Sequence, residues 1–524
     1  MEIEALLSLG MFLVAIGALM AGYPVALTLG GVALVFALIG ITLGIFPEPL
    51  LRAFPNRIQG TMENSVLIAV PLFVLMGVVL ERSRVAEDLL DIASRLLAGV
   101  RGGLGYAVVI VGALLAASTG IVGATVITMT LIALPTMLKQ GYNTPLATGT
   151  IAASGTLGQI IPPSIVLILL ADAISNANQT ASLAGGLPPS AVSVGDLFAG
   201  ALIPGLLLVG LYLTYLIAMS VLRPATCPPA TEHGANLPTF REICFGLGAP
   251  LLLIVAVLGS IMAGLASPTE ASAIGAGGAI ILAGLRLARE AGSRLAPVLV
   301  AGLLGAVLII LLSNFADLRV TRDEIPSADQ TWIVLAAVSA LVFAAGLAAG
   351  MAVIHRTGRF IPALSSASKI TSMVFLILIG ASLFSLVLRG YGGDEMIETV
   401  LRGMPGGKWG ALALTMLVMF LLGFFLDFIE IVFVVVPLVA PPLILLGVDP
   451  VWLAILMALN LQTSFLTPPF GFALFYLRGA APDGVETADI WRGAIPFIGL
   501  QLLMIALVAA LPALSTWLPA VAAR

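Results

Sequence analysis

The stretch LNLQTSFLTPPFGF, residues 459–472, decides how the rest of this chain is organised. It places amide and hydroxyl side chains, two adjacent prolines and a glycine inside an apolar segment that runs from about 450 to 477. Because proline has no amide donor and glycine relaxes the backbone, we expect the helix to break at Pro468 and Pro469. Lipid cannot satisfy the freed backbone groups, so they must face protein, water or cargo. Broken helices near the membrane centre are typical of secondary transporters.

The composition excludes a soluble protein. Of the 524 residues, 60% are hydrophobic and 10% are charged, and the mean hydropathy is +1.15, whereas soluble domains carry roughly a quarter charged residues. The net charge of −4 and the lack of a basic tract predict no nucleic-acid partner. The two cysteines predict neither a disulfide framework nor a metal cluster, and no cofactor is expected.

Long apolar runs predict an all-α polytopic membrane protein with about 12 transmembrane helices. Two further apolar stretches, 104–140 and 409–446, are interrupted in the middle and predict re-entrant hairpins. Residues 82–101 have helical periodicity with charges on one face, which predicts a helix in the membrane interface. The spans cover roughly residues 5–22, 24–45, 65–81, 145–172, 196–222, 244–266, 270–287, 296–314, 331–353, 370–389, 450–477 and 494–516.

The positive charges predict the orientation of the chain, because Lys and Arg are retained on the cytoplasmic side. With both termini in the periplasm, most of the 23 Lys and Arg residues lie inside. The polar loop predicted over 173–195 has no Lys or Arg and then lies outside. This scheme puts hairpin 104–140 on the cytoplasmic side and hairpin 409–446 on the outer side. Opposed hairpins indicate an inverted repeat.

An offset of 306 residues reveals that repeat in the sequence. It maps Pro162 to Pro468 and Pro163 to Pro469, so both halves carry a span broken at Pro-Pro. The same offset maps other punctuating and polar residues onto one another: Pro135 to Pro441, Gly141 to Gly447, Ser154 to Asn460 and Thr156 to Gln462. Two such halves, facing each other, predict one site near the midplane.

Polar and small residues at the hairpin tips and breaks are the candidate ligands. Freed carbonyls, hydroxyls and amides suit a hard cation such as Na⁺. The candidate substrate-binding residues are Ser118, Thr119, Gly158, Gln159, Pro162, Pro163, Asp427, Gln462, Thr463, Pro468 and Pro469. The candidate Na⁺ ligands are Ser118, Gly120, Ser154, Gly155, Thr156, Asn460, Thr463, Thr467 and Gly471.

Structural explanations stay open beside these roles. The small residues at the first tip also permit close helix packing, and the Pro-Pro pairs also act as plain kinks. Asp427 and Glu430, one helical turn apart, need either a cation or a basic partner from this or another subunit, because an acid within a span costs about 2.5–3.5 kcal/mol. Glu270 lies in SPTEAS, residues 267–272, where an N-cap by Ser267 or Thr269 also explains the motif.

These motifs together resemble the large membrane (M) subunit of tripartite ATP-independent periplasmic (TRAP) transporters. The resemblance covers both halves of the chain. It is carried by GTLGQIIPPS (155–164), FLTPPFGF (465–472), PLFVLMG (71–77), ASTGIVGATVITMTLIALPTMLKQGY (117–142) and SPTEAS. The second hairpin, FLDFIEIVFVVVPLVAPP (425–442), is similar to the branch associated with 2-oxo acids, lactate and aromatic carboxylates.

The resemblance implies a Na⁺-coupled importer of small organic acids in the bacterial inner membrane. It also implies an elevator mechanism, with a fold like that of divalent-anion/Na⁺ symporters. Two partners are implied: a small four-span membrane (Q) subunit and a periplasmic substrate-binding (P) protein. Spans 296–314 and 331–353 are two more than the usual subunit has, and Asp427 and Glu430 form an acidic pair that many members lack.

The chain then divides into six predicted regions. They are the N-terminal spans and interfacial helix (1–102), the first hairpin and broken helix (103–175), connecting spans (176–290), a two-span insertion (291–369), the second hairpin and broken helix (370–480) and a C-terminal span (481–524).

Rival functions make different demands on the sequence. An ATP-driven pump needs a phosphate-binding GxxxxGKS/T loop, which is absent. An intramembrane protease needs Ser-His or paired Asp within spans, and both histidines fall in predicted loops. We therefore expect no enzyme. A stand-alone Na⁺/carboxylate symporter stays the alternative, and a channel is a more distant one.

Overall fold

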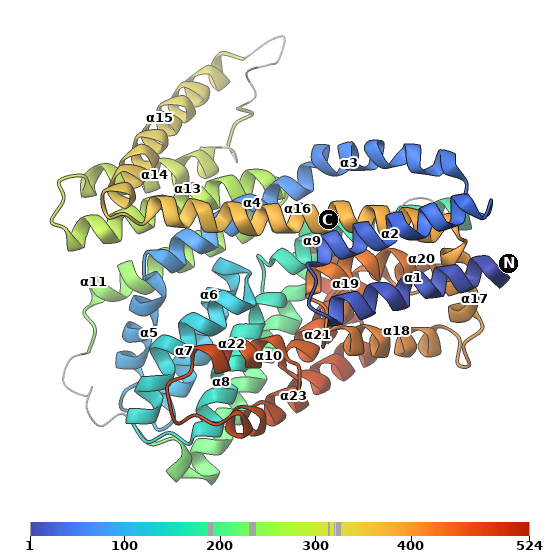
Figure 1. The fold of residues 1–524 in the computed structure, drawn as a ribbon. Helices are drawn as coiled ribbons and strands as arrows, with labels where there is room; N and C mark the ends of the chain where they lie inside the picture. Colours follow the sequence, from blue (N-terminus) through green and yellow to red (C-terminus); the bar gives the residue numbers. More distant parts are fainter. Residues whose placement is uncertain are drawn as a thin grey trace.

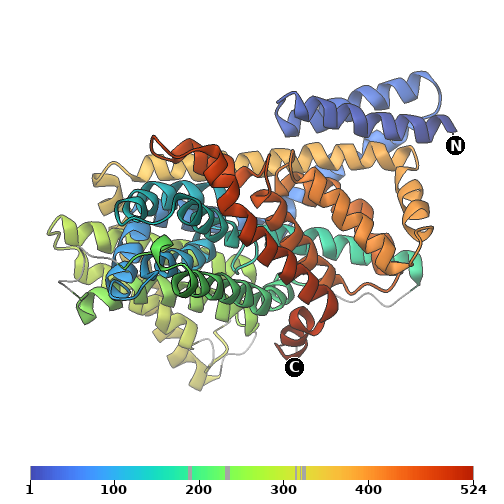
Figure 2. The same cartoon turned by 90° about the horizontal axis from the view of Figure 1, so that it is seen from below.

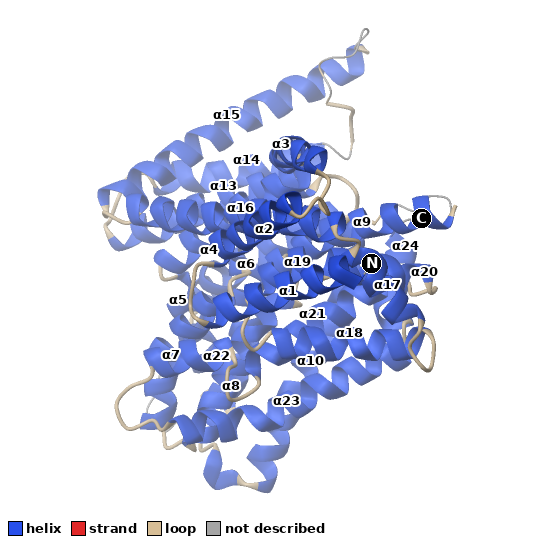
Figure 3. Cartoon of the chain, turned by 45° about the vertical axis from the view of Figure 1, so that its right-hand side comes forward, coloured by secondary structure: helices blue, strands red, loops and turns tan. Residues whose placement is uncertain are grey.

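The computed structural model describes residues 2–186, 192–229, 237–312, 315–318, 320 and 326–522. Over these residues the chain forms helices and connecting loops without a β-strand (Figure 3). In this described part, ten helices are long and apolar enough to cross a membrane, or 11 when one bent pair counts as a single span. Shorter apolar helices account for the other predicted spans and hairpin arms. The prediction of an all-α polytopic membrane protein is confirmed.

The N-terminal region begins with two apolar helices that lie side by side along one edge of the molecule (Figures 1 and 2). Pro24 immediately precedes the second helix, where a missing amide is tolerated. The side chain of Asn64 accepts a hydrogen bond from the Val66 amide and so starts α4. The elements here are α1 (Glu2–Met20), α2 (Val25–Thr42), η1 (Glu48–Ala53), α3 (Phe54–Glu63), α4 (Ser65–Arg82) and α5 (Val85–Leu96).

The predicted repeat is confirmed by helices that begin 306 residues apart. Asn143 and Asp449 occupy equivalent positions, and each caps the next helix through its side chain. Gly141 and Gly447, two residues earlier, both have φ of 83° and end the preceding helix. Repeat 1 contains α6 (Gly103–Thr119), α7 (Val122–Lys139), α8 (Thr144–Thr156), η2 (Leu157–Gln159) and α9 (Ile165–Gly185). Repeat 2 contains α18 (Lys408–Leu422), α19 (Phe428–Val434), α20 (Val436–Leu445), α21 (Pro450–Leu466) and α22 (Phe472–Ala480).

The remaining helices surround these repeats. The two-span insertion, α14 and α15, packs closely on α13, and α15 projects from the rest of the molecule (Figure 1). A Cβ on Gly302 of α14 would lie 2.8 Å from the Cα of Gly346 of α15, so small residues set this approach. These elements are α10 (Val194–Leu222), η3 (Pro224–Thr226), α11 (Phe240–Glu242), the π-helical turn η4 (Ile243–Gly248), α12 (Ala249–Met262), α13 (Pro268–Glu290), α14 (Ala296–Leu312), α15 (Ser327–Arg356), α16 (Phe360–Gly390), α17 (Gly393–Arg402), α23 (Thr487–Ala510) and α24 (Ala513–Ala522).

One boundary prediction was wrong. The polar loop expected over 173–195 begins later, because α9 continues to Gly185. Its sequence there is alanine-rich and lacks an early glycine or proline, so helix propensity outweighs polarity. Among the described residues, the predicted spans missed α3, α17 and the single turn α11, and the helix α24 extends beyond the last predicted span. Of these, α17 is the repeat equivalent of α5, the helix predicted to lie in the interface, since Leu96 and Arg402 end them 306 residues apart.

Candidate functional site

Both proline-containing spans break where the sequence predicts. In repeat 1 the helix gives way at Thr156 to the short turn η2, and α9 starts only at Ile165, after the two prolines. In repeat 2, α21 ends at Leu466 and α22 starts at Phe472. The Pro162–Pro163 and Pro468–Pro469 peptide bonds are both cis. Each break therefore leaves about five residues of non-helical backbone between two half-helices.

The hairpins pack across the repeats. The second arm of hairpin 1, α7, contacts α22 of repeat 2, and the second arm of hairpin 2, α20, contacts α9 of repeat 1. At the tip of hairpin 1, Gly120 has φ of 60° and adjoins the first residue of α9, Ile165. Nearby, a Cβ on Gly123 would lie 3.0 Å from the ring of Tyr476 on α22. This crossed packing brings both tips toward both breaks.

The two repeats meet directly through equivalent residues. The Gln462 Nε2 donates to the Thr156 Oγ1 over 3.4 Å, and the two positions are separated by the repeat offset of 306. Gln501 of α23 donates to the same Thr156 oxygen over 3.3 Å and to the Tyr212 hydroxyl over 2.8 Å. All four side chains are fully buried. Thr156 and Gln462, which the 306-residue offset makes equivalent, are thus in direct contact inside the protein.

Several amide atoms around this contact have no hydrogen-bond partner among the described residues. Gln159 is fully buried, and neither its oxygen nor its nitrogen has a hydrogen-bond partner within the described residues. The Oε1 atoms of Gln462 and Gln501 are likewise unpaired there. An unsatisfied buried amide costs about 1–3 kcal/mol. Such atoms in a membrane protein are candidate ligands for a cation or a polar cargo group.

The candidate Na⁺ ligands whose hydroxyl groups are described all donate to carbonyls three or four residues earlier in the chain: Ser154, Thr156, Thr463 and Thr467. Ser154 donates to the Thr150 oxygen over 2.6 Å, and Thr463 donates to the Leu459 oxygen over 2.8 Å. Thr467 donates to the Thr463 oxygen over 2.7 Å. Because a hydroxyl that donates retains its acceptor lone pairs, each oxygen can still accept a cation. These hydroxyls are therefore held in fixed directions by the helix backbone.

Asn460 and the glycine candidates have packing roles. Asn460 donates from Nδ2 to the Met416 oxygen of α18 over 2.8 Å, which joins the broken helix to hairpin 2. Val126 packs so closely on Gly155 that a residue with a Cβ would not fit there. Gly158 packs on Ala116 of hairpin 1.

Gly471 and the first hairpin tip complete the candidate set. The Gly471 amide donates to the Thr467 oxygen over 3.0 Å and closes the second break. The side chains of Ser118 and Thr119 lie outside the described residues.

Asp427 and Glu430 cap the second arm of hairpin 2. The Asp427 Oδ1 accepts from the Phe428 amide over 2.7 Å, and the Glu430 Oε2 accepts from the Asp427 amide over 3.1 Å. The first amides of a helix have no carbonyl partner within the helix, and at α19 the two carboxylates accept their hydrogen bonds. No basic partner for these acids is found in this chain: over the described residues, no Lys or Arg forms an ion pair with either one.

Comparison with known proteins identifies the family. The family model "Tripartite ATP-independent periplasmic transporter, DctM component" matches residues 11–514. This chain belongs to that family. It is 28% identical over 514 residues to the C4-dicarboxylate TRAP transporter large permease protein DctM of Vibrio cholerae, covering 97% of this chain and 96% of the relative.

Other relatives and one solved structure agree. This TRAP subunit is 25% identical to the ectoine TRAP transporter large permease protein TeaC of Halomonas elongata, with 97% and 98% of the chains covered. It is 24% identical to the sialic acid TRAP transporter large permease protein SiaM of Vibrio cholerae, with 96% of each covered. The crystal structure of the Alcanivorax borkumensis YdaH transporter shares its fold at 15% identity, with a TM-score of 0.53 over 89% of each chain. The protein is a multi-pass inner-membrane transporter subunit and not an enzyme.

The SPTEAS motif of this TRAP subunit has a structural role. The Ser267 Oγ accepts from the Glu270 amide over 3.3 Å, and the Glu270 Oε2 accepts from the Ser267 amide over 2.8 Å. Thr269 donates to the Ser65 oxygen over 2.6 Å and ties the start of α13 to α4. The N-cap explanation of the motif is confirmed.

Three residues at the site were missed by the sequence reasoning. Tyr212 on α10 and Gln501 on α23 complete the buried network, and Tyr476 on α22 contacts the first hairpin tip. Gln501 carried a usable signal, since it is an isolated amide within the apolar run 494–514. Tyr212 and Tyr476 carried none, because aromatic residues are ordinary in transmembrane helices and their positions depend on tertiary packing.

Proposed function

We propose that this chain is the membrane permease of a Na⁺-driven TRAP importer for small organic acids. The carrying observation is the buried contact between Thr156 and Gln462, where two helices of the repeat meet and amide oxygens remain unpaired. Half-helices and freed backbone groups at such a meeting point suit a small anion and its coupling cations.

The two breaks would hold Na⁺ through oxygen atoms. Hydroxyls held in fixed directions and unpaired amide oxygens match the ligand preference of a hard cation. The proposed ligands in repeat 1 are Ser118, Gly120, Ser154, Gly155 and Thr156, and those in repeat 2 are Asn460, Thr463, Thr467 and Gly471. Binding at two related sites would let the Na⁺ gradient drive uptake.

The cargo would lie between the hairpin tips and the breaks. Gln159, Gln462 and Thr463 offer polar contacts for a carboxylate, beside the backbone of Gly158 and the two proline pairs. The rings of Phe425 and Phe470, with centroids 5.1 Å apart, offer apolar contacts. This combination supports a small carboxylate with a compact apolar body, such as a 2-oxo acid, lactate or an aromatic acid.

The chain would work with two partners. The family is tripartite, and C4-dicarboxylate, sialic acid and ectoine are the cargoes in its relatives' names. A small four-span (Q) subunit would join this chain in the membrane, and a periplasmic (P) protein would deliver the cargo. The crossed hairpins and broken helices would move together, as an elevator, against the remaining spans. The amphipathic helices α5 and α17, which precede the two hairpins, would connect the moving and fixed parts.

The test is uptake by proteoliposomes with defined components. We expect uptake of a labelled carboxylate to need an inward Na⁺ gradient, the four-span subunit and the loaded binding protein together. Equal uptake with K⁺, or with a proton gradient alone, would overturn the Na⁺ coupling. Robust Na⁺-driven uptake by this chain alone would instead establish the stand-alone symporter, and rapid flux that does not saturate with cargo would indicate a channel.

A further inference from the structure

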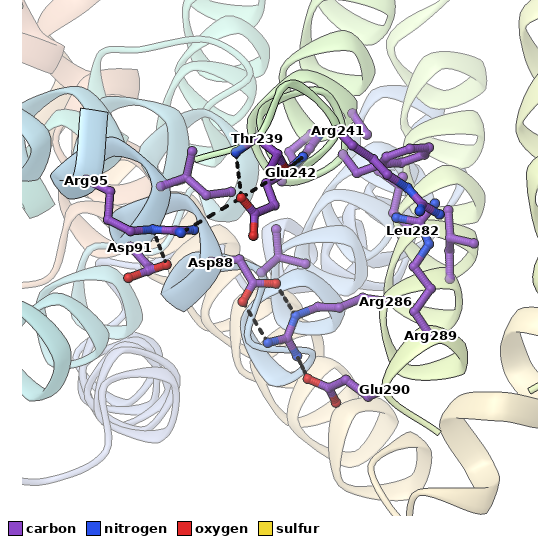
Figure 4. A pocket seen from close by; sticks show the side chains of 17 residues that line it. Asp88, Asp91, Arg95, Thr239, Arg241, Glu242, Leu282, Arg286, Arg289 and Glu290 are labelled. Carbon is purple, nitrogen blue, oxygen red and sulfur yellow. Dashed lines mark hydrogen bonds and ion pairs between the residues drawn. The ribbon is translucent and has the colours of Figure 1, made fainter. Parts of the chain in front are cut away.

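A pocket lined by both charged and apolar side chains lies apart from the two breaks. It is bordered by α5, by the segment α11–η4 at the start of α12, and by the last turns of α13, and its volume is about 530 Å³ (Figure 4). Apolar side chains form part of its wall, among them Val85, Ile92, Pro250, Leu282 and Leu285. None of the candidate transport residues lines it.

Eight charged side chains line this pocket, four acidic and four arginine. The four acids form ion pairs with only two of the four arginines. The Arg95 guanidinium lies 3.0 Å from Asp91 and 3.8 Å from Glu242. The remaining ion pairs join Arg286 to Asp88, with a hydrogen bond of 2.9 Å from Nη2, and to Glu290 at 3.3 Å. Two carboxylates lie on each of these arginines, so this side of the pocket has the excess of negative charge and the excess of positive charge lies with the other two arginines.

The other two arginines, Arg241 and Arg289, have no such partners. Arg289 lies over the ring of Phe245, with its Cζ 3.7 Å from the centroid. Figure 4 shows Arg289 and Arg241 on the same side of the pocket. Within the described residues no carboxylate lies at ion-pair distance from either one. Two guanidiniums on one side of the pocket, neither held by a carboxylate there, offer paired hydrogen-bond donors to an anion.

Their place in the fold puts both arginines at one membrane surface. Arg241 lies at the beginning of the apolar span Phe240–Met262, and Arg289 lies at the end of the apolar span Pro268–Glu290. These two spans are packed neighbours that run in opposite directions, so their charged ends meet. Phe240 and Leu237 are 81% and 78% exposed beside them, as expected where a protein faces lipid.

We propose that Arg241 and Arg289 form a binding site for a phosphate group, supplied by the headgroup of an anionic phospholipid. Guanidinium groups match phosphate oxygens with paired hydrogen bonds, which lysine cannot reproduce as well. The depth of the two arginines matches the headgroup layer, and the apolar wall accommodates the start of an acyl chain. Because α5 forms one side of the pocket, a lipid bound there contacts both the α12–α13 pair and the helix that leads into hairpin 1.

Native mass spectrometry of the detergent-solubilised full chain tests this site. The probes are phosphatidylglycerol, phosphatidylcholine of the same acyl length, and inorganic phosphate as a competitor. We expect the wild type to retain phosphatidylglycerol in preference to phosphatidylcholine. In the double variant Arg241→Gln/Arg289→Gln that retention should weaken by roughly fivefold for each arginine removed.

A matched control removes the same charge elsewhere. Arg101 and Arg356 are exposed arginines away from the pocket, and Arg101→Gln/Arg356→Gln should retain phosphatidylglycerol like the wild type. The variant Arg241→Lys/Arg289→Lys keeps the charges and should retain part of the binding, which separates lost binding from lost folding. Equal retention in the Gln variant and the control would overturn the proposal. Competition by inorganic phosphate without any preference for phosphatidylglycerol would overturn the lipid as the source of the phosphate.

Discussion

The two broken-helix regions follow one backbone plan but carry different chemistry. In repeat 1 the break is polar and closed, since Gln159 and Ser164 are both fully buried. The equivalent positions in repeat 2 are Phe465 and Phe470, and Phe470 is 42% exposed. The repeat therefore determines the positions at which the helices break, and the side chains at those positions determine which groups each half offers to a ligand. Repeat 1 supplies buried polar groups, and repeat 2 supplies an aromatic and more open wall.

The largest expected effect comes from removing the polar group of repeat 1. We expect Gln159→Leu to lower uptake more than about tenfold, because the unpaired buried amide serves cargo or ion binding. Folding should be unharmed or stabilised, since leucine has no polar atom to leave unsatisfied. The measurements are initial uptake in proteoliposomes and thermal unfolding in detergent.

Repeat 2 offers a matched control for that variant. The Thr415 hydroxyl of α18 is also buried without a partner among the described residues, but it lies outside the break. Thr415→Val should leave uptake near the wild-type value. Normal uptake by Gln159→Leu would contradict a functional role for the buried amide of repeat 1. An equal loss of uptake in Gln159→Leu and Thr415→Val would contradict it as well.

The second difference between the repeats is the acidic pair in hairpin 2. Repeat 1 has Ile121 and Ala124 at the positions of Asp427 and Glu430. We expect Asp427→Asn to lower uptake several-fold, more than it lowers folded yield, and to weaken the Na⁺ dependence. Asparagine still caps a helix but cannot supply the negative charge that a cation prefers. Glu430→Gln should have the smaller effect.

Uptake measured against Na⁺ concentration separates the possible roles of this pair. An unchanged Na⁺ curve together with lost complex formation would make the pair structural. Normal uptake by both variants would show that the acids do not distinguish the two repeats in function.

The smallest effect should come from residues that the repeats share. Asn143 and Asp449 cap α8 and α21 in the same way. We expect Asn143→Ala and Asp449→Ala each to cost about 1 kcal/mol of stability, with similar Na⁺ curves. Thermal unfolding of the two variants side by side checks this. A large loss of uptake in only one of them would show that the capping regions are not equivalent.

Much of this architecture could be predicted because membrane helices have strong local signals. The Pro-Pro pairs located both breaks, and the offset between them paired Thr156 with Gln462 before any contact was known. The surroundings could not be predicted, because the contacts of Tyr476 and Tyr212 depend on how distant helices cross. For Asp427, the acidic character was visible, but the capping geometry depends on where α19 begins. The polar segment after residue 173 was wrongly predicted as a loop because of its polar side chains. Its alanines favour a helix, and α9 continues through it.

The central claim is that the two repeats build one shared site at Thr156 and Gln462. A double-mutant cycle of Na⁺-driven uptake, with Thr156→Val, Gln462→Leu and the double variant, tests it most directly. If the two side chains act as one unit, the double variant should lose no more activity than the worse single variant. Two losses that simply multiply, with folded yield unchanged, would contradict a shared site.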